Sequence, residues 1–419
     1  MYWYARRAPG VAKTLVREVR ADVAIVGGGV AGLSCAQRLR AAGVSVVVLE
    51  RDFCGAGASG KSSGFVTPAS EIQLGSLIAS RGREEARRIW DFVCSGVEAI
   101  RANILAHELD CDYEVQDSLF VANDGAGWRA VQAEHRARLE LGYPSRLYDA
   151  RALPEVLTTT RYAGGVRYGS TFAIDAYAYC QELRDVLVSQ GVRIFEGSRV
   201  TRLDADGVEA AAGRVRAGHV VVCTDRFIPE LGALGRDIYH VQTCLAVSSS
   251  LSEADVHKVF TSDRAMTWDS DLVYRYFRMI GGNRLLLGGG DLRHTYARAP
   301  MARMDPFVRR ASAYLRAKFP DLAVRVEYAW PGMLGISKDL LPIMRPDPVH
   351  DRIWYVGAAT GLPWAAALGV YAAERILTGR TDFDDAFSPE RKFVIGHRLQ
   401  AFLSTPLTFA ISHGIARYS

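Results

Sequence analysis

Residues 22–50 contain the pattern that most constrains the fold of this chain. An apolar run over residues 23–26 is followed by Gly27, Gly29 and Gly32, which form the sequence G-x-G-x-x-G. In such a strand-to-helix turn the first glycine permits a tight bend, the second lets a pyrophosphate approach, and the third lets helix and strand pack closely. A helix over residues 33–42, a second strand over 44–49 and then Glu50 follow, and this spacing is typical of the acid that binds a ribose hydroxyl. The stretch predicts a dinucleotide site, and Glu50 would repel a 2′-phosphate, which leaves FAD or NAD.

A second glycine-rich segment separates these two cofactors. Residues 55–64 read G-A-G-A-S-G-K-S-S-G, and such small residues suit a loop pressed against a cofactor, with Lys61 near phosphate charge. Together the two motifs resemble the FAD-dependent D-amino-acid oxidase superfamily, in its glycine oxidase, sarcosine oxidase and γ-glutamylputrescine oxidase branch. The family usually has Arg-Asn-Gly-Gly where residues 61–64 are Lys-Ser-Ser-Gly, so the subfamily stays open. The resemblance implies that FAD contacts Arg51, Ala58, Ser59, Lys61, Ser62, Ser63 and Gly64 here.

Two later segments are expected to complete the cofactor domain. Asp175 can cap a helix over residues 176–190, and strands follow near 192–195, 200–203, 215–216 and 219–224. The resemblance places Val200 beside the adenine and Thr224 at the cofactor, although plain core packing is the alternative for the Val200 side chain. A strand over residues 353–356 then leads into a helix that begins at Pro363. In the family this helix N-terminus faces the flavin N1–C2=O edge, where it stabilises negative charge. The contacts expected there are Gly357, Gly361, Leu362, Pro363 and Trp364.

The expected fold is mixed α/β and α+β, with a Rossmann-like FAD-binding domain of the glutathione-reductase type and an inserted antiparallel-sheet substrate domain. The FAD-binding domain is expected over residues 15–70, 171–224 and 331–387, and the substrate domain over 71–170 and 225–330. A long helix is predicted over residues 80–109, and a hairpin over 274–288 turns at Gly281, Gly282 and Asn283. An apolar tail over residues 388–419 could dock on the body, form a dimer contact or lie on a membrane surface, of which docking is favoured.

The resemblance also implies the chemistry. Substrate is expected between the flavin and the hairpin sheet, where the carbon beside a nitrogen loses a hydride to flavin N5 and gives an imine. Tyr276, Trp364 and Arg278 are the candidate catalytic residues, and the aromatic side chains around them suit a bulky, aromatic or cationic amine. Two alternatives stay open: a 2-hydroxy-acid or polyol dehydrogenase on the same fold, and a flavin-binding subunit without its own turnover.

Three departures from the family sharpen this hypothesis. Leu334 falls near the arginine that clamps the substrate carboxylate in glycine oxidase-like members, so a simple α-amino acid is disfavoured and Arg275 or Arg278 is left to meet an acid. Met333 and Leu334 replace the cysteine that attaches FAD in sarcosine oxidases, which predicts non-covalent FAD. Leu286 replaces a lysine associated with oxygen activation, so the electron acceptor can be O₂ or another molecule.

Bulk composition excludes several other classes. With 419 residues, 49% of them hydrophobic, the chain is long enough for two domains. Its net charge of +5 comes from arginines spread along the chain, which disfavours nucleic acid binding. The seven cysteines form no C-x-x-C pair, which indicates a reducing compartment such as the cytoplasm, and the histidines show no metal-ligand spacing. No apolar segment is long enough to span a membrane, membrane contact by the tail is disfavoured, and the oligomeric state stays open.

Overall fold

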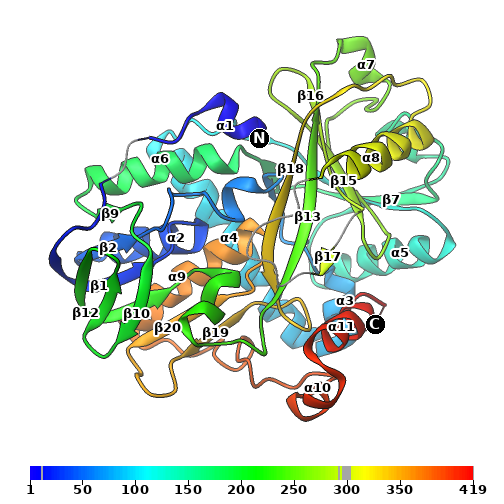
Figure 1. The fold of residues 1–419 in the computed structure, drawn as a ribbon. Coiled ribbons are helices and arrows are strands. Elements are labelled where there is room, and N and C mark those ends of the chain that lie inside the picture. The colour runs from blue at the N-terminus through cyan, green and yellow to red at the C-terminus, as the bar shows by residue number, and fades with distance from the viewer. Residues whose placement is uncertain (11–12, 291–292, 295–302, 419) are drawn as a thin grey trace.

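Two large sheets organise the molecule and stand side by side in Figure 1. The structure is a computed structural model that describes residues 1–10, 13–290, 293–294 and 303–418. The first sheet contains the glycine-rich turn, and its central strands pair in parallel. In order its strands are β10 (Val200–Asp204), β11 (Gly207–Ala210), β12 (Gly213–Val222), β1 (Glu18–Val26), β2 (Val46–Leu49) and β9 (Arg193–Phe195), with β20 (Ile353–Gly357) beside β12 and β19 (Ile343–Pro346) beside β20.

Helices cover this parallel sheet, and close backbone approaches fix their packing. The helix α2 (Val30–Ala41) follows the glycine-rich turn and packs against α9 (Leu362–Thr378). Gly369 makes that approach possible, because a Cβ there would lie 2.1 Å from the carbonyl oxygen of Ala31. Asp175 caps α6 (Ala176–Ser189) as predicted, since its side chain accepts hydrogen bonds from the Tyr177 and Ala178 amides.

Two predicted elements have different boundaries in the structure. The helix expected over residues 80–109 is two helices, α3 (Leu74–Arg81) and α4 (Arg83–His107), because Gly82 between them has a positive φ of 81°. The separate strands expected at 215–216 and 219–224 are one strand, β12, which pairs with β1 over its length. The polar residues in the middle of β12 obscured this continuity.

The second sheet is mostly antiparallel and lies to the right of the first sheet in Figure 1. The predicted hairpin is confirmed, since β15 and β16 pair from Arg275–Gly289 to Ile280–Arg284. The boundary expected at residue 331 falls inside β18, which pairs with β13 as far as Ile336. The strands are β17 (Arg293–His294), β13 (Tyr239–Ser248), β16 (Arg284–Gly289), β15 (Arg275–Ile280), β14 (Met266–Asp269), β5 (Ser118–Ala122), β7 (Gly164–Tyr168) and β6 (Arg146–Asp149), with β18 (Val326–Ile336) beside β13.

Short elements complete the second half and join it to the first. A third, small sheet has three strands, and one parallel pair, β14 with β5, interrupts the antiparallel order of the second large sheet. The small sheet consists of β3 (Phe65–Val66), β8 (Phe172–Ala173) and β4 (Glu114–Val115). The remaining helices of this half are α5 (Gly125–Glu140), α7 (Glu253–His257) and α8 (Asp305–Lys318), and short 3₁₀ turns cover Ser59–Lys61, Leu153–Glu155 and Asp225–Leu231.

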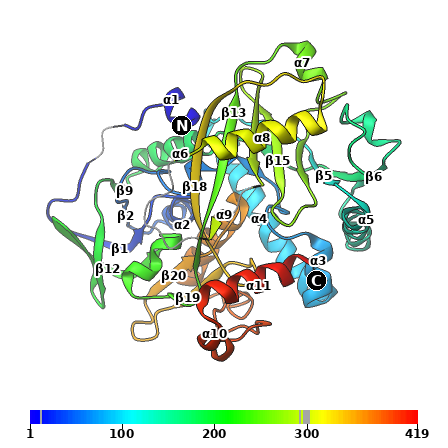
Figure 2. The same ribbon diagram turned by 45° about the vertical axis from the view of Figure 1, so that its right-hand side comes forward.

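Both ends of the described chain pack on the body. The N-terminal helix α1 (Tyr2–Arg6) buries Trp3 against a cluster that includes Trp330, with ring centroids 6.2 Å apart. The tail forms α10 (His397–Leu403) and α11 (Thr405–Tyr418), and α11 contacts α3 and β13 (Figure 2). Phe409 is fully buried and stacks on Tyr239, so this part of the tail docks on the body. No helix in these described segments is both long and apolar enough to cross a membrane.

Candidate functional site

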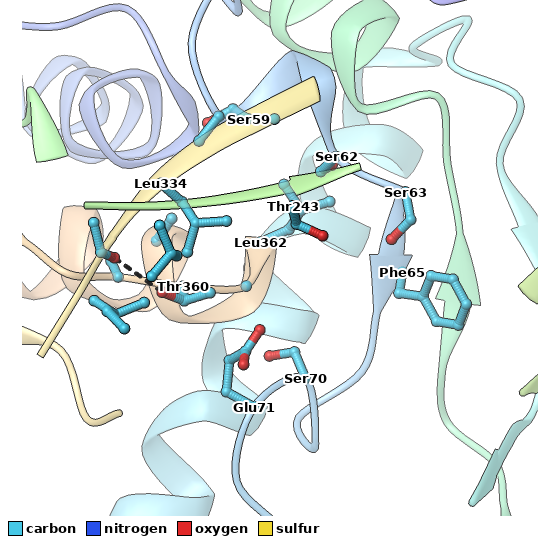
Figure 3. Close-up of a pocket in the computed structure, with 18 of the residues that line it drawn as sticks. Ser59, Ser62, Ser63, Phe65, Ser70, Glu71, Thr243, Leu334, Thr360 and Leu362 are labelled. Atoms are coloured by element: carbon cyan, nitrogen blue, oxygen red, sulfur yellow. Dashed lines mark hydrogen bonds between the residues drawn. The ribbon is translucent and has the colours of Figure 1, made fainter. Parts of the chain in front are cut away.

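A cavity of about 330 Å³ lies where the two sheets meet. All three segments expected to bind the cofactor contribute to its wall, together with strands of the antiparallel sheet (Figure 3). Nine of the predicted site residues line it: Gly29, Ala58, Ser59, Lys61, Ser62, Ser63, Tyr276, Gly361 and Leu362. Segments hundreds of residues apart therefore converge on one space.

The glycine-rich turn has the geometry that a close cofactor approach needs. A Cβ at Gly32 would lie 2.0 Å from the carbonyl oxygen of Gly27, so only glycine lets α2 sit this close to β1. Gly29 itself lines the cavity, and a Cβ there would lie 3.0 Å from Ser59 Oγ. The Ser59 hydroxyl also accepts a hydrogen bond from the Val30 amide at 3.1 Å, which ties the second motif to the start of α2.

Glu50 directly follows β2 beside this turn, outside the cavity lining. Its carboxylate accepts hydrogen bonds from the Gly28 amide at 2.8 Å and from the Asp52 amide at 2.9 Å. Burial raises the pKa of Glu50. Several other predicted cofactor contacts also lie outside the cavity lining: Gly27, Gly32, Arg51, Gly64, Val200, Thr224, Gly357 and Pro363.

Three successive carbonyl groups of the second motif are held by buried donors. Trp330 Nε1 donates to the Lys61 carbonyl at 3.1 Å, and Trp3 Nε1 donates to the Ser62 carbonyl at 3.2 Å. Arg278 Nε donates to the Ser63 carbonyl at 2.7 Å. None of the three donors lines the cavity, so they hold the loop from behind while its side chains face the cavity. We call residues 61–63 and these three donors the carbonyl clamp.

Arg278, a predicted catalytic residue, lies outside the cavity lining. Besides the Ser63 carbonyl, its guanidinium donates to the carbonyls of Ile174 at 2.7 Å and Met279 at 3.1 Å. The side chain is buried, and this burial lowers its pKa to about 10. Because its donors are directed at main-chain carbonyls outside the cavity, Arg278 has no free face toward a substrate.

Trp364 also differs from its prediction as a wall of the pocket. The ring is buried and packs against Phe92 and Phe387, with centroids 6.3 Å and 6.2 Å away. Its neighbours Leu362 and Ala365, three residues apart on the helix, line the cavity instead. The side chain at 364 therefore points toward α4, away from the cavity.

The start of α9, which the family resemblance places at the flavin, contributes Gly361 and Leu362 to the cavity lining. Gly361 precedes the helix with a φ of 101°, and a Cβ there would lie 2.2 Å from Ser70 Oγ. Asp225 holds this turn in place, because its carboxylate accepts hydrogen bonds from the Gly335 amide at 2.7 Å and the Ala358 amide at 3.0 Å. The sequence reasoning missed Asp225, although its place just after β12 was a usable signal, since parallel strands carry their sites at the carboxyl end.

Aromatic side chains form the opposite part of the cavity wall. Phe65 lies edge-on to Tyr276 with centroids 5.5 Å apart and to Trp268 at 6.4 Å. Tyr274 continues the row, with its centroid 5.8 Å from that of Tyr276. All four rings line the cavity, so the prediction of an aromatic wall fits the geometry, with Phe65 as a member that the sequence reasoning did not single out.

A protein-family model and a bacterial protein both match most of this chain. The model of the DAO family, described as FAD dependent oxidoreductase, matches residues 22–375. The gamma-glutamylputrescine oxidoreductase of Escherichia coli is 29% identical over 402 residues, which are 92% of this chain and 91% of the relative.

Two solved structures share the fold of this chain. Glycine oxidase from Geobacillus kaustophilus has a TM-score of 0.75 at 19% identity and covers 89% of this chain and 99% of its own. L-proline dehydrogenase from P. horikoshii has a TM-score of 0.74 at 16% identity and covers 90% of this chain and 98% of its own. The predicted fold class, a Rossmann-like FAD-binding domain with a second sheet, is confirmed.

Proposed function

The chain belongs to the family of FAD-dependent oxidoreductases, and from that premise we propose that it oxidises a C–N bond of a small-molecule amine. The observation that carries the proposal is the cavity itself, which has a cofactor-type wall on one side and an aromatic wall on the other. The E. coli relative is named for gamma-glutamylputrescine, a putrescine derivative, which supports an amine as substrate.

The residues present fit FAD at the first wall. Gly29 leaves room that a Cβ would fill, and Ser59 to Ser63 form a loop of small side chains along the same space. The N-terminus of α9 carries partial positive charge, which suits the anionic edge of a reduced flavin. When bound, FAD would accept a hydride, that is, two electrons and one proton, from the substrate carbon.

The protein's own part in the reaction is positioning and exclusion of water. Tyr276 lies in the middle of the aromatic wall, and burial followed by the charge of Glu71 raises the pKa of its phenol. The phenol therefore stays neutral and can donate a hydrogen bond to a substrate nitrogen or oxygen. The surrounding rings keep water from the reacting bond and present an apolar surface to the carbon beside it.

We also propose that FAD is held without a covalent bond. Met333 and Leu334 line the cavity where covalent relatives of the sarcosine oxidase type carry a cysteine. The thiol of Cys223 lines the cavity as well, but burial raises its pKa to about 12. A thiol with this pKa is protonated at neutral pH and is a poor nucleophile. Acid precipitation should therefore release FAD into the supernatant, and yellow colour retained by the precipitate would contradict this proposal.

The test of the proposed function is the visible spectrum of the purified holoprotein, recorded without oxygen as donors are added. An amine should bleach the flavin bands, and a 2-hydroxy acid or polyol of the same carbon skeleton should not. Bleaching by the hydroxy compound alone would replace the proposal with the dehydrogenase alternative. A flavin that neither class bleaches would favour a flavin-binding subunit. Admitting air afterwards shows whether O₂ serves as the electron acceptor.

A further inference from the structure

Among the described residues, the aromatic wall carries one carboxylate, that of Glu71. Glu71 lines the cavity next to Ser70, and Tyr274 Oη donates to Glu71 Oε1 at 3.3 Å and to the Ser70 carbonyl at 3.0 Å. Figure 3 shows the Glu71 carboxylate directed into the space below the strand that carries Thr243. Tyr274 therefore holds the Glu71 carboxylate beside the aromatic rings of the wall, of which its own ring is one.

The four rings and this carboxylate form a single cage, which consists of Phe65, Trp268, Tyr274, Tyr276 and Glu71. Successive ring centroids lie 6.4, 5.5 and 5.8 Å apart, so the ring surface is continuous. The charge of Glu71 also acts on Tyr276, whose pKa it raises after the larger effect of burial. The carboxylate is therefore electrostatically coupled to the centre of the cage.

Of the described residues that line the cavity, the other two with charged side chains, Lys61 and Asp225, belong to the cofactor side. Lys61 lies in the glycine-rich loop, and the Asp225 carboxylate is engaged by the Gly335 and Ala358 amides. Of the described residues that line the cavity, none is an arginine, the residue type that pairs bidentately with carboxylates. Aromatic faces and a carboxylate both attract cations. The cage is therefore suited to a cationic ammonium.

We propose that Glu71 and the cage bind a second ammonium group of the substrate, distinct from the nitrogen beside the oxidised carbon. This inference rests on the proposed amine oxidation. A nitrogen can assist loss of a hydride from its neighbouring carbon only when its lone pair is free. A carboxylate beside that nitrogen would favour the protonated form and so oppose the reaction. The ammonium at Glu71 is therefore the non-reacting one, and the substrate class is a diamine or an amine with a distal ammonium.

Two probes of equal length test this, namely hexane-1,6-diamine and hexylamine. Their dissociation constants for the FAD-loaded protein are measured by anaerobic calorimetry at pH 7.5, for the wild type, Glu71→Gln and Glu84→Gln. The wild type should bind the diamine at least tenfold more tightly than hexylamine. Glu71→Gln should reduce this ratio to below twofold and leave hexylamine binding within twofold. Glu84→Gln, at an exposed glutamate on α4, should keep the wild-type ratio.

Three results would overturn the inference: equal binding of the two probes by the wild type, a ratio that survives Glu71→Gln, or an equal loss for both probes. The last would place the reacting nitrogen at Glu71. If Glu71→Gln fails to fold, Tyr274→Phe serves instead, because it removes the bond that holds the carboxylate and should reduce the ratio severalfold. Binding does not require bleaching, so a diamine that binds selectively but never bleaches the flavin contradicts the proposed oxidation alone.

Discussion

The two walls of the cavity are built in different ways. The cofactor wall depends on main-chain atoms: glycines that let backbones approach, and carbonyl groups held by the carbonyl clamp. The substrate wall depends on side chains, namely a row of aromatic rings and the Glu71 carboxylate. Main-chain geometry suits a constant ligand such as a dinucleotide, whereas side chains can be exchanged to suit a different substrate. The comparison implies that substitutions on the two walls will affect different measurements.

The largest expected effect is the loss of the cofactor when the glycine-rich turn is filled. In Gly32→Ala the new Cβ would meet the Gly27 carbonyl oxygen at 2.0 Å, and the backbone must shift. We expect destabilisation of about 3 kcal/mol and at least a hundredfold weaker FAD binding. FAD content after purification and thermal unfolding measure both. Gly125→Ala is the matched control, because it lies outside both glycine-rich motifs and a Cβ there meets nothing within 4 Å, so both quantities should stay unchanged. FAD retained by Gly32→Ala would refute the account of the turn.

The second prediction tests whether the Arg278 side chain has a structural or a catalytic role. Arg278→Met removes one donor from each of three buried carbonyls. The Met279 carbonyl keeps the Gln116 side-chain donor at 3.3 Å, so at about 1 kcal/mol for each of the other two the loss of stability should be about 2 kcal/mol. FAD binding should weaken by roughly tenfold, because the clamp on Ser63 is opened. Unfolding by denaturant and FAD titration measure these effects. Arg129→Met, at an exposed arginine on α5, is the control. Unchanged stability with lost turnover would restore the catalytic interpretation.

The third prediction concerns the N-terminal helix, which the clamp makes part of the cofactor wall. Trp3→Phe keeps the aromatic packing but removes the donor to the Ser62 carbonyl. A lost hydrogen bond of about 1 kcal/mol corresponds to roughly fivefold weaker FAD binding. Tyr4→Phe removes only a longer bond of 3.4 Å and should change FAD binding by less than twofold. Fluorescence titration of the FAD-free protein compares the two, and equal affinities would remove α1 from the cofactor site.

The same difference between the walls explains what the sequence could predict. The glycine-rich turn, the Asp175 cap and the β15–β16 hairpin depend on residues close together in the chain, and all three are present as predicted. The clamp joins residues 59, 215 and 269 positions apart, and no local pattern encodes such contacts. Arg278 and Trp364 were assigned to the site by position alone. The direction of each side chain depends on a partner in a distant segment. For Arg278 this partner is the Ile174 carbonyl, and for Trp364 it is the Phe92 ring.

The smallest expected effect lies on the substrate wall and involves the tail. Phe409 is fully buried on Tyr239, and its neighbour Ala410 lines the cavity, so the tail forms part of the cavity wall. Phe409→Ala should loosen α11 and raise KM for an amine about threefold, with FAD binding unchanged, because no residue of α11 belongs to the carbonyl clamp. Phe402→Ala is the matched control, since that ring is 87% exposed and should change neither quantity. An altered FAD affinity in Phe409→Ala would contradict the separation of the two walls. An altered KM in Phe402→Ala would instead indicate that the exposed apolar face of α10 contributes to the active form through a contact outside this chain, as the subunit alternative requires.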